Sequence, residues 1–134
     1  PPWPGATSSK RTYTAHCHCG DLCWSFELSP PLWLQSAQQN KDEQIYPVTQ
    51  CGCSFCARHG ILSVHPPARS IRFLTGRSDD EKDEVSGKGK TRYKTGCRLG
   101  EWWFCGRCGS VGGLDFGKQS GVVDEDGEPR SLVN

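Results

Sequence analysis

Seven of the nine cysteines in this chain fall into three short groups whose spacing is typical of metal ligands. The first group is the C-x-C pair Cys17 and Cys19, and the last is the C-x2-C pair Cys105 and Cys108. A glycine follows each pair, so we expect each on a tight turn beside a strand, with two sulfurs aimed at one point. Two such pairs from distant parts of a chain supply the four ligands of a closed tetrahedral zinc site.

A closed site of this kind would tie the two ends of the fold together. Most of the 134 residues lie between the two pairs, and the apolar fraction of 34% is low for a globular protein. Because the energy of metal binding becomes folding energy when the ligands come from distant segments, the ion would compensate for a modest core. The length predicts one domain.

The middle group, Cys51, Cys53 and Cys56, places three sulfurs within six residues and has no fourth cysteine beside it. Structural zinc sites have four protein ligands, whereas catalytic sites commonly have three and keep a position for water or substrate. Three alternatives remain: an open or exchangeable position, a fourth protein ligand, or no metal at this group. The fourth ligand of the site could be water, His59, His65 or Cys97.

Several other polar residues lie beside these groups. We expect His16 and His18 to point away from Cys17 and Cys19 on an extended backbone and to lie on the surface. Cys23 is on the polar side of its strand and is expected to be an ordinary thiol. Arg58 and Arg107 are each either a solvated side chain or a partner for an anionic substrate.

Composition and charge limit the classes of function. An odd number of cysteines without the apolar run of a secretory signal favours metal binding over disulfides, and predicts an intracellular protein, in the cytoplasm or the nucleus. The net charge is +1, and two zinc ions bound by seven thiolates would bring it to about −2. We therefore expect no nucleic-acid partner. No stretch approaches the roughly 18 apolar residues of a membrane span, so no membrane partner is expected either.

The chain between the cysteine groups predicts a mainly β protein of short strands joined by turns. Leu22, Trp24, Phe26 and Leu28 alternate with polar residues, which predicts a half-buried strand. Of Trp102, Trp103 and Phe104, at least one is expected in the core. The predicted strands are two within 11–28 and one each at 32–37, 61–65, 71–75, 90–95, 101–104 and 111–116. Loops are predicted at 38–44 and 76–89, and residues 1–10 are predicted to be a flexible lead-in.

Three motifs, in this order, resemble the family of glutathione-dependent formaldehyde-activating enzymes, which also includes centromere protein V. They are HCHCG (16–20), CGCSFCARHG (51–60) and WFCGRCGS (103–110). Residues 71–76 and 91–93 also look like strands of that family, and the resemblance covers roughly residues 14–116. Residues 11–117 are thus expected to be a zinc domain of this type, and 118–134 a tail or a truncated part of the same domain.

The resemblance implies a small β-tent-type fold of short antiparallel strands with two zinc ions per chain. Cys17, Cys19, Cys105 and Cys108 match the ligands of the structural zinc, and Cys51, Cys53 and Cys56 those of a second zinc linked to catalysis. It also implies a carbon–sulfur lyase-type reaction that adds a small thiol such as glutathione to formaldehyde or a related aldehyde. The alternative is a non-catalytic zinc scaffold, or a thiol or zinc sensor, that binds a protein partner. Cys97 and the 96–101 segment depart from the family pattern.

Overall fold

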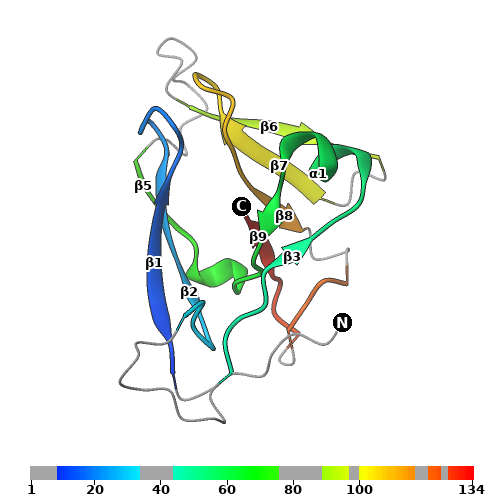
Figure 1. Ribbon diagram of the computed structural model, residues 1–134. Helices are drawn as coiled ribbons and strands as arrows, with labels where there is room; N and C mark the ends of the chain where they lie inside the picture. Colours follow the sequence, from blue (N-terminus) through cyan, green and yellow to red (C-terminus); the bar gives the residue numbers. More distant parts are fainter. Residues whose placement is uncertain (1–8, 34–43, 76–88, 97–99, 117–120, 125–126) are drawn as a thin grey trace.

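A computed structural model of the chain describes residues 9–33, 44–75, 89–96, 100–116, 121–124 and 127–134. It confirms the predicted fold class: the protein is mainly β, with small antiparallel sheets and two cysteine clusters that could bind metal (Figure 1). The elements in order are β1 (Arg11–His16), β2 (Cys23–Leu28), β3 (Thr49–Gln50), α1 (Ser54–His59), β4 (Leu62–Ser63), the 3₁₀ turn Ala68–Ser70, β5 (Arg72–Thr75), β6 (Lys90–Lys94), β7 (Gly100–Cys105), β8 (Val111–Phe116) and β9 (Ser131–Val133).

The first sheet has the strand order β1-β2-β5, with both pairs antiparallel. Its central strand β2 shows the alternation that the sequence predicts, because Trp24, Phe26 and Leu28 are buried while the residues between them are only half-buried. The turn between β1 and β2 carries Cys17 and Cys19 at the end of this sheet.

The second sheet has the order β6-β7-β8-β9, and its strand β7 divides the core in two. Trp103 packs edge-on against Trp24 of the first sheet, with ring centroids 4.9 Å apart. The adjacent Trp102 belongs to a separate buried cluster with Cys56, Ile61 and other apolar side chains. Successive side chains of a strand point to opposite faces, so β7 presents one tryptophan to the first sheet and the other to α1.

A third, two-stranded sheet holds the middle cysteine group in place. Strands β3 and β4 pair antiparallel, with Thr49 opposite Ser63 and Gln50 opposite Leu62, and the cysteines lie on the segment that connects them. The pair is attached to the second sheet by reciprocal backbone hydrogen bonds between Val64 and Val133, of 2.9 and 3.0 Å.

The strands predicted within 11–28 and at 61–65, 71–75, 90–95, 101–104 and 111–116 are present, with bounds that differ by a few residues. The strand predicted over 32–37 is absent at residues 32–33, where the chain bends and the Leu32 amide donates to the Tyr13 hydroxyl instead of to a strand. Residues 34–37 lie outside the described part, as do 38–43 of one predicted loop, 76–88 of the other and 1–8 of the lead-in.

Four of the described elements were not predicted: the two-residue strand β3, the helix α1, the 3₁₀ turn Ala68–Ser70 and the strand β9. The helix α1 lies within the middle cysteine group, and β9 lies within the segment that was expected to be a tail. Strand β9 pairs with β8, and all three of its residues are buried. In the part of the chain that the structure describes, no helix has the length and hydrophobicity needed to cross a membrane.

Candidate metal centres and an adjoining pocket

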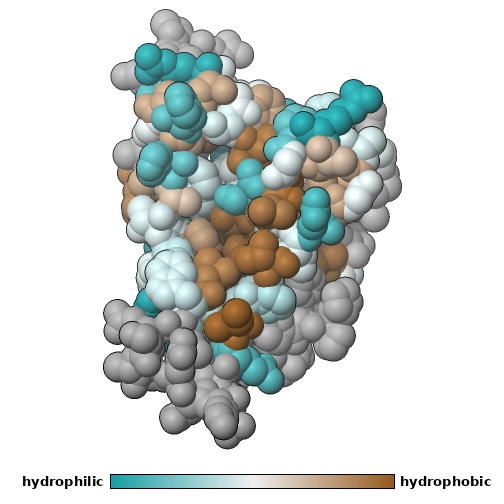
Figure 2. Space-filling model, in the orientation of Figure 1, coloured by the Kyte–Doolittle hydropathy of each residue, from teal (hydrophilic) through white to brown (hydrophobic). Residues whose placement is uncertain are grey.

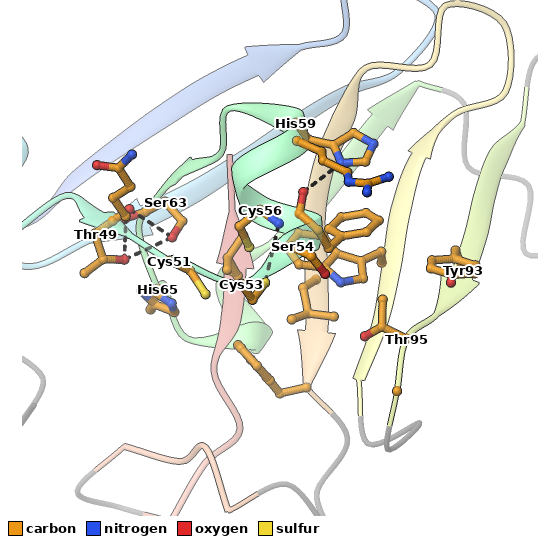
Figure 3. A pocket seen from close by; sticks show the side chains of 18 residues that line it. Thr49, Cys51, Cys53, Ser54, Cys56, His59, Ser63, His65, Tyr93 and Thr95 are labelled. Atoms are coloured by element: carbon orange, nitrogen blue, oxygen red, sulfur yellow. Dashed lines mark hydrogen bonds between the residues drawn. The ribbon is translucent and has the colours of Figure 1, made fainter.

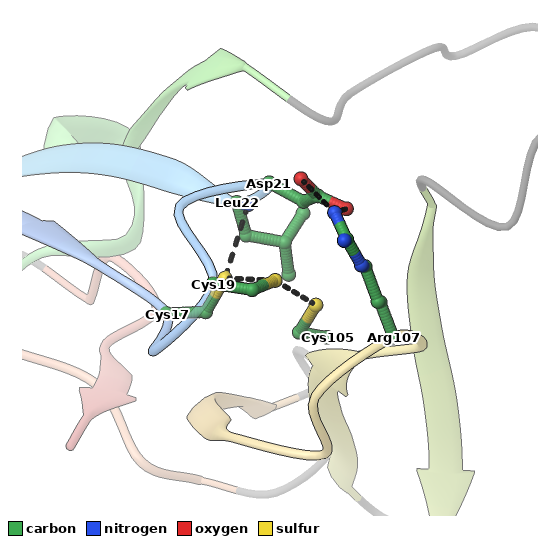
Figure 4. A network of polar contacts seen from close by, with 6 residues as sticks. All are labelled: Cys17, Cys19, Asp21, Leu22, Cys105 and Arg107. Atoms are coloured by element: carbon green, nitrogen blue, oxygen red, sulfur yellow. Dashed lines mark hydrogen bonds and ion pairs between the residues drawn. The ribbon is translucent and has the colours of Figure 1, made fainter.

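The sulfurs of Cys17, Cys19, Cys105 and Cys108 form one cluster in which all four lie within 4.8 Å of one another. The Sγ atoms of Cys17 and Cys19 are 3.6 Å apart, and those of Cys19 and Cys105 are also 3.6 Å apart (Figure 4). Tetrahedral zinc with Zn–S bonds of about 2.3 Å places its sulfurs about 3.8 Å apart. The donor set and its spacing therefore fit a closed four-thiolate metal site.

Two tight turns bring these sulfurs together. In the β1–β2 turn, the Cys17 amide donates to the Leu22 carbonyl, and the Leu22 amide donates to the Cys17 sulfur at 3.2 Å. In the β7–β8 turn, the Cys105 amide donates to the Ser110 carbonyl at 3.0 Å. Both turns contain a glycine with positive φ, which a residue with a Cβ adopts only at a cost.

The cluster is anchored to the core on one side and reaches the surface on the other. Cys17 and Cys105 are 2% and 1% exposed, and both pack within the core cluster that contains Trp103. Cys108 is hydrogen-bonded to the Ser110 hydroxyl at 3.3 Å, and hydrogen bonds from the Ser110 side chain and backbone lower the pKa of the Cys108 thiol to about 5. A group that favours its thiolate form is suited to binding a cation.

The second cluster contains only the sulfurs of Cys51, Cys53 and Cys56. Cys56 is buried, whereas Cys51 and Cys53 are exposed. The pKa of Cys56 is raised to about 12, first by its burial and then by the neighbouring thiols of Cys53 and Cys51. The neighbouring thiols contribute because adjacent sulfurs repel each other's negative charge. A bound cation removes that repulsion, and soft thiolates suit zinc among the divalent metals. The three donors thus fit a metal site with an incomplete shell.

The local fold explains the position of these three sulfurs. Cys53 is the N-cap of α1, and its sulfur accepts a hydrogen bond from the Cys56 amide at 3.4 Å. This backbone hydrogen bond, followed by contacts with the thiols of Cys56 and Cys51, lowers the pKa of Cys53 to about 7. At the other end of α1, Gly60 takes the left-handed conformation with φ 62°, and the Ile61 amide caps the Cys56 carbonyl.

A pocket of about 930 Å³ opens beside the three-sulfur cluster. In Figure 3, Cys51, Cys53 and Cys56 lie between Thr49, Ser63 and His65 on one side and Tyr93 and Thr95 on the other. The sequence motifs did not indicate Thr49, Ser63, Tyr93 or Thr95, because these residues come from three other strands and a turn. Trp102, one of the three aromatic residues of which at least one was expected in the core, lines the pocket and is 4% exposed.

The structure separates the candidates for a fourth ligand. Among the described residues, neither His59 nor His65 brings a ring nitrogen into the three-sulfur cluster. The ring of His59 forms a hydrogen bond with the Phe55 carbonyl through Nδ1, at 2.9 Å, whereas His65 lines the pocket wall. Cys97 lies outside the described residues. Within the described part, the cluster is therefore open on its pocket side.

The structure also shows where the other polar residues named from the sequence lie. Arg58 lines the pocket, whereas Arg107 forms an ion pair with Asp21, 3.4 Å away, beside the four-sulfur cluster (Figure 4). His16 and His18 are exposed and in neither cluster, and Cys23 is half-buried and also in neither. Ser110, the last residue of the motif at 103–110, was not assigned a role from the sequence, and it hydrogen-bonds both the Cys108 sulfur and the His18 amide.

His65 is expected to stay neutral at pH 7 and to gain its proton only near pH 4. Burial, followed by the positive charge of Arg130, lowers its pKa from 6.5 to about 4. Because the unfolded chain then binds the proton more readily than the folded one, His65 lowers stability as the pH falls from 6.5 towards 4. An NMR titration of the imidazole measures the value, and Arg130→Gln should raise it partway. A titration midpoint near 6.5 in the wild type would contradict the burial of this ring.

Comparisons with known proteins support the fold and leave the function open. No protein-family model matches the sequence, and no curated protein matches it. The crystal structure of a Rhodobacter sphaeroides protein, a Northeast Structural Genomics target, is similar with a TM-score of 0.57 and 22% sequence identity. The match covers 91% of this chain and 84% of that protein. At this identity, the likeness concerns the fold alone.

Proposed function

We propose that the protein binds two zinc ions and uses the second site to add a small thiol to formaldehyde or a related aldehyde. One ion is assigned to Cys17, Cys19, Cys105 and Cys108, and the other to Cys51, Cys53 and Cys56. The observation that supports the proposal is the contrast between the two clusters: the first has four sulfurs, and the second has three beside an open pocket. The motifs that resemble glutathione-dependent formaldehyde-activating enzymes support the same assignment.

Zinc at the second cluster would supply a positive charge that keeps a substrate thiol in its reactive thiolate form at neutral pH. The pocket residues do the remaining work. Thr49 and Ser63, whose hydroxyls lie 3.0 Å apart and each donate to the other residue's backbone carbonyl, form a polar side of the pocket together with neutral His65. Buried Trp102, Leu114 and Leu132 line the same pocket and make part of its wall apolar.

The reaction itself requires no oxidant or reductant. The substrate sulfur forms a bond with the carbonyl carbon, the π electrons of the carbonyl group move to its oxygen, and the proton lost by the thiol ends on that oxygen. With glutathione and formaldehyde, the product is S-hydroxymethylglutathione. The test is the rate of exchange between free and thiol-bound aldehyde, measured by NMR with and without zinc-loaded protein. Equal rates in the two samples would contradict catalysis.

Cys53→Ser is expected to lower the zinc content from two ions per chain towards one while the fold is retained. Cys53 is exposed and contributes to the second cluster only, so its loss leaves the four-sulfur cluster and the core intact. Elemental analysis gives the zinc content, and circular dichroism reports the fold. The matched control is Cys23→Ser, which changes a thiol in neither cluster and should keep both ions. Two ions in Cys53→Ser would rule out this ligand assignment.

A zinc or thiol sensor is the second candidate, and the exposure of Cys51 and Cys53 favours it because a metal held there can be exchanged with solvent. A sensor should lose or gain the second zinc when glutathione is added, and a catalyst should not. A scaffold should keep both ions and leave the rate of exchange unchanged. Zinc titration with and without glutathione distinguishes these results.

A further inference from the structure

One side of the pocket is built from aromatic rings that pack on one another. The ring of Phe55 stacks on Trp102 with centroids 4.5 Å apart, and on Tyr93 with centroids 6.0 Å apart. Tyr93 is 52% exposed, whereas Phe55 is half-buried and Trp102 is buried. Tyr93 therefore extends the apolar surface from the core out to the mouth of the pocket (Figure 3).

The interior of the pocket is apolar as well. Leu114 and Leu132 are 9% and 5% exposed, and half-buried Phe116 at the end of β8 lies with its ring 6.4 Å from that of His65. These residues line the same pocket as the three cysteines. A compound whose sulfur meets the cysteine cluster would therefore have its carbon body against apolar side chains.

Apart from the cysteines, the described lining of the pocket has one side chain with a permanent charge. Among the described lining residues, Arg58 carries a positive charge and no side chain carries a carboxylate. Glutathione has an ammonium group and two carboxylates. Its ammonium would find no carboxylate partner in the lining, and only one carboxylate could pair with Arg58. Burying the others without partners is costly, so the lining disfavours a charged peptide thiol.

From these features we infer that the thiol taken by this site carries an aromatic or branched apolar group. The inference rests on the proposed function and specifies its substrate class. The thiol would give up its proton to solvent as its sulfur took the open position on a zinc ion held by Cys51, Cys53 and Cys56, and its apolar group would lie against the ring of Tyr93. Apolar area removed from water supplies the preference.

Calorimetric titration of the zinc-loaded protein tests this preference with three probes: phenylmethanethiol, 2-mercaptoethanol and glutathione. We expect phenylmethanethiol to bind at least about tenfold more tightly than either of the others, because its ring removes apolar area from water. Glutathione binding as tightly as phenylmethanethiol would overturn the inference but leave the proposed function standing. A failure of all three thiols to bind would overturn both.

Variants locate the preference in the pocket. Tyr93→Ser should reduce the advantage of phenylmethanethiol to about threefold or less, while the binding of 2-mercaptoethanol changes little. Leu74→Ser is the matched control, because Leu74 is a 56% exposed apolar residue on β5 that does not line the pocket. An unchanged advantage in Tyr93→Ser, an exposed position where folding is not at risk, would overturn the inference.

Discussion

Cys105→Ser is expected to leave the chain largely unfolded. Cys105 is 1% exposed, and its sulfur lies 3.6 Å from that of Cys19 in the four-sulfur cluster. A structural zinc site contributes about 10–16 kcal/mol of binding energy in small peptides, and domains of this size are stable by about 5–15 kcal/mol. Weakening such a site therefore removes a large part of the total stability, and serine also leaves a buried hydroxyl in place of a thiolate.

Circular dichroism and the dispersion of amide NMR signals measure the loss of structure in this variant. Cys23→Ser is the control, since it changes a half-buried thiol on neighbouring β2 that belongs to neither cluster. A chelator added to the wild type should produce the same unfolding, and added zinc should reverse it. A folded Cys105→Ser protein with a melting temperature near that of the wild type would show that the cluster does not hold the fold.

Gly113→Ala is expected to destabilise the protein by about 3 kcal/mol or more, at the upper end of overpacking in a core. A Cβ at this position on β8 would lie 2.7 Å from Trp103 Cζ2 and closer still to the backbone oxygen of Leu132. The backbone oxygen belongs to β9 and cannot turn away as a side chain can. The substitution must push apart two paired strands or displace the tryptophan that packs against Trp24.

The free energy of unfolding from urea titration gives the size of this effect. Gly89→Ala is a suitable control, because a Cβ there meets nothing within 4 Å and the backbone is not in the left-handed region. Its stability should stay within about 1 kcal/mol of the wild type. If Gly113→Ala were as stable as this control, the result would contradict the close packing of β8 on Trp103.

The parts of the fold that follow local rules could be predicted from the sequence. Alternation along residues 22–28 predicts β2, and the spacing of the cysteine pairs indicates that their sulfurs converge. The six-residue helix α1 is too short for a helical period to stand out, although Gly60 after His59 is a typical end signal. Strand β9 is only three residues long and follows a polar segment, so its apolar residues gave no pattern.

The pocket could not be predicted, because it depends on contacts between distant segments. Tyr93 and Trp102 are brought together by the pairing of β6 with β7, and Phe55 reaches them from α1. Thr49 and Ser63 meet through the pairing of β3 with β4. No spacing rule relates these residues. The lining residues that the sequence did indicate are Cys51, Cys53, Cys56, Arg58, His59 and His65.

The four-sulfur cluster also has a consequence for how quickly the chain reaches its native state. It joins Cys19 to Cys105 across 86 positions, which is the kind of long-range contact that slows folding. Each pair of sulfurs, however, sits on the turn of its own hairpin, β1–β2 or β7–β8, which can form locally. The slow event is therefore a single ring closure between two preassembled halves rather than a search by four separate residues, and its entropic cost rises only slowly with the length between them.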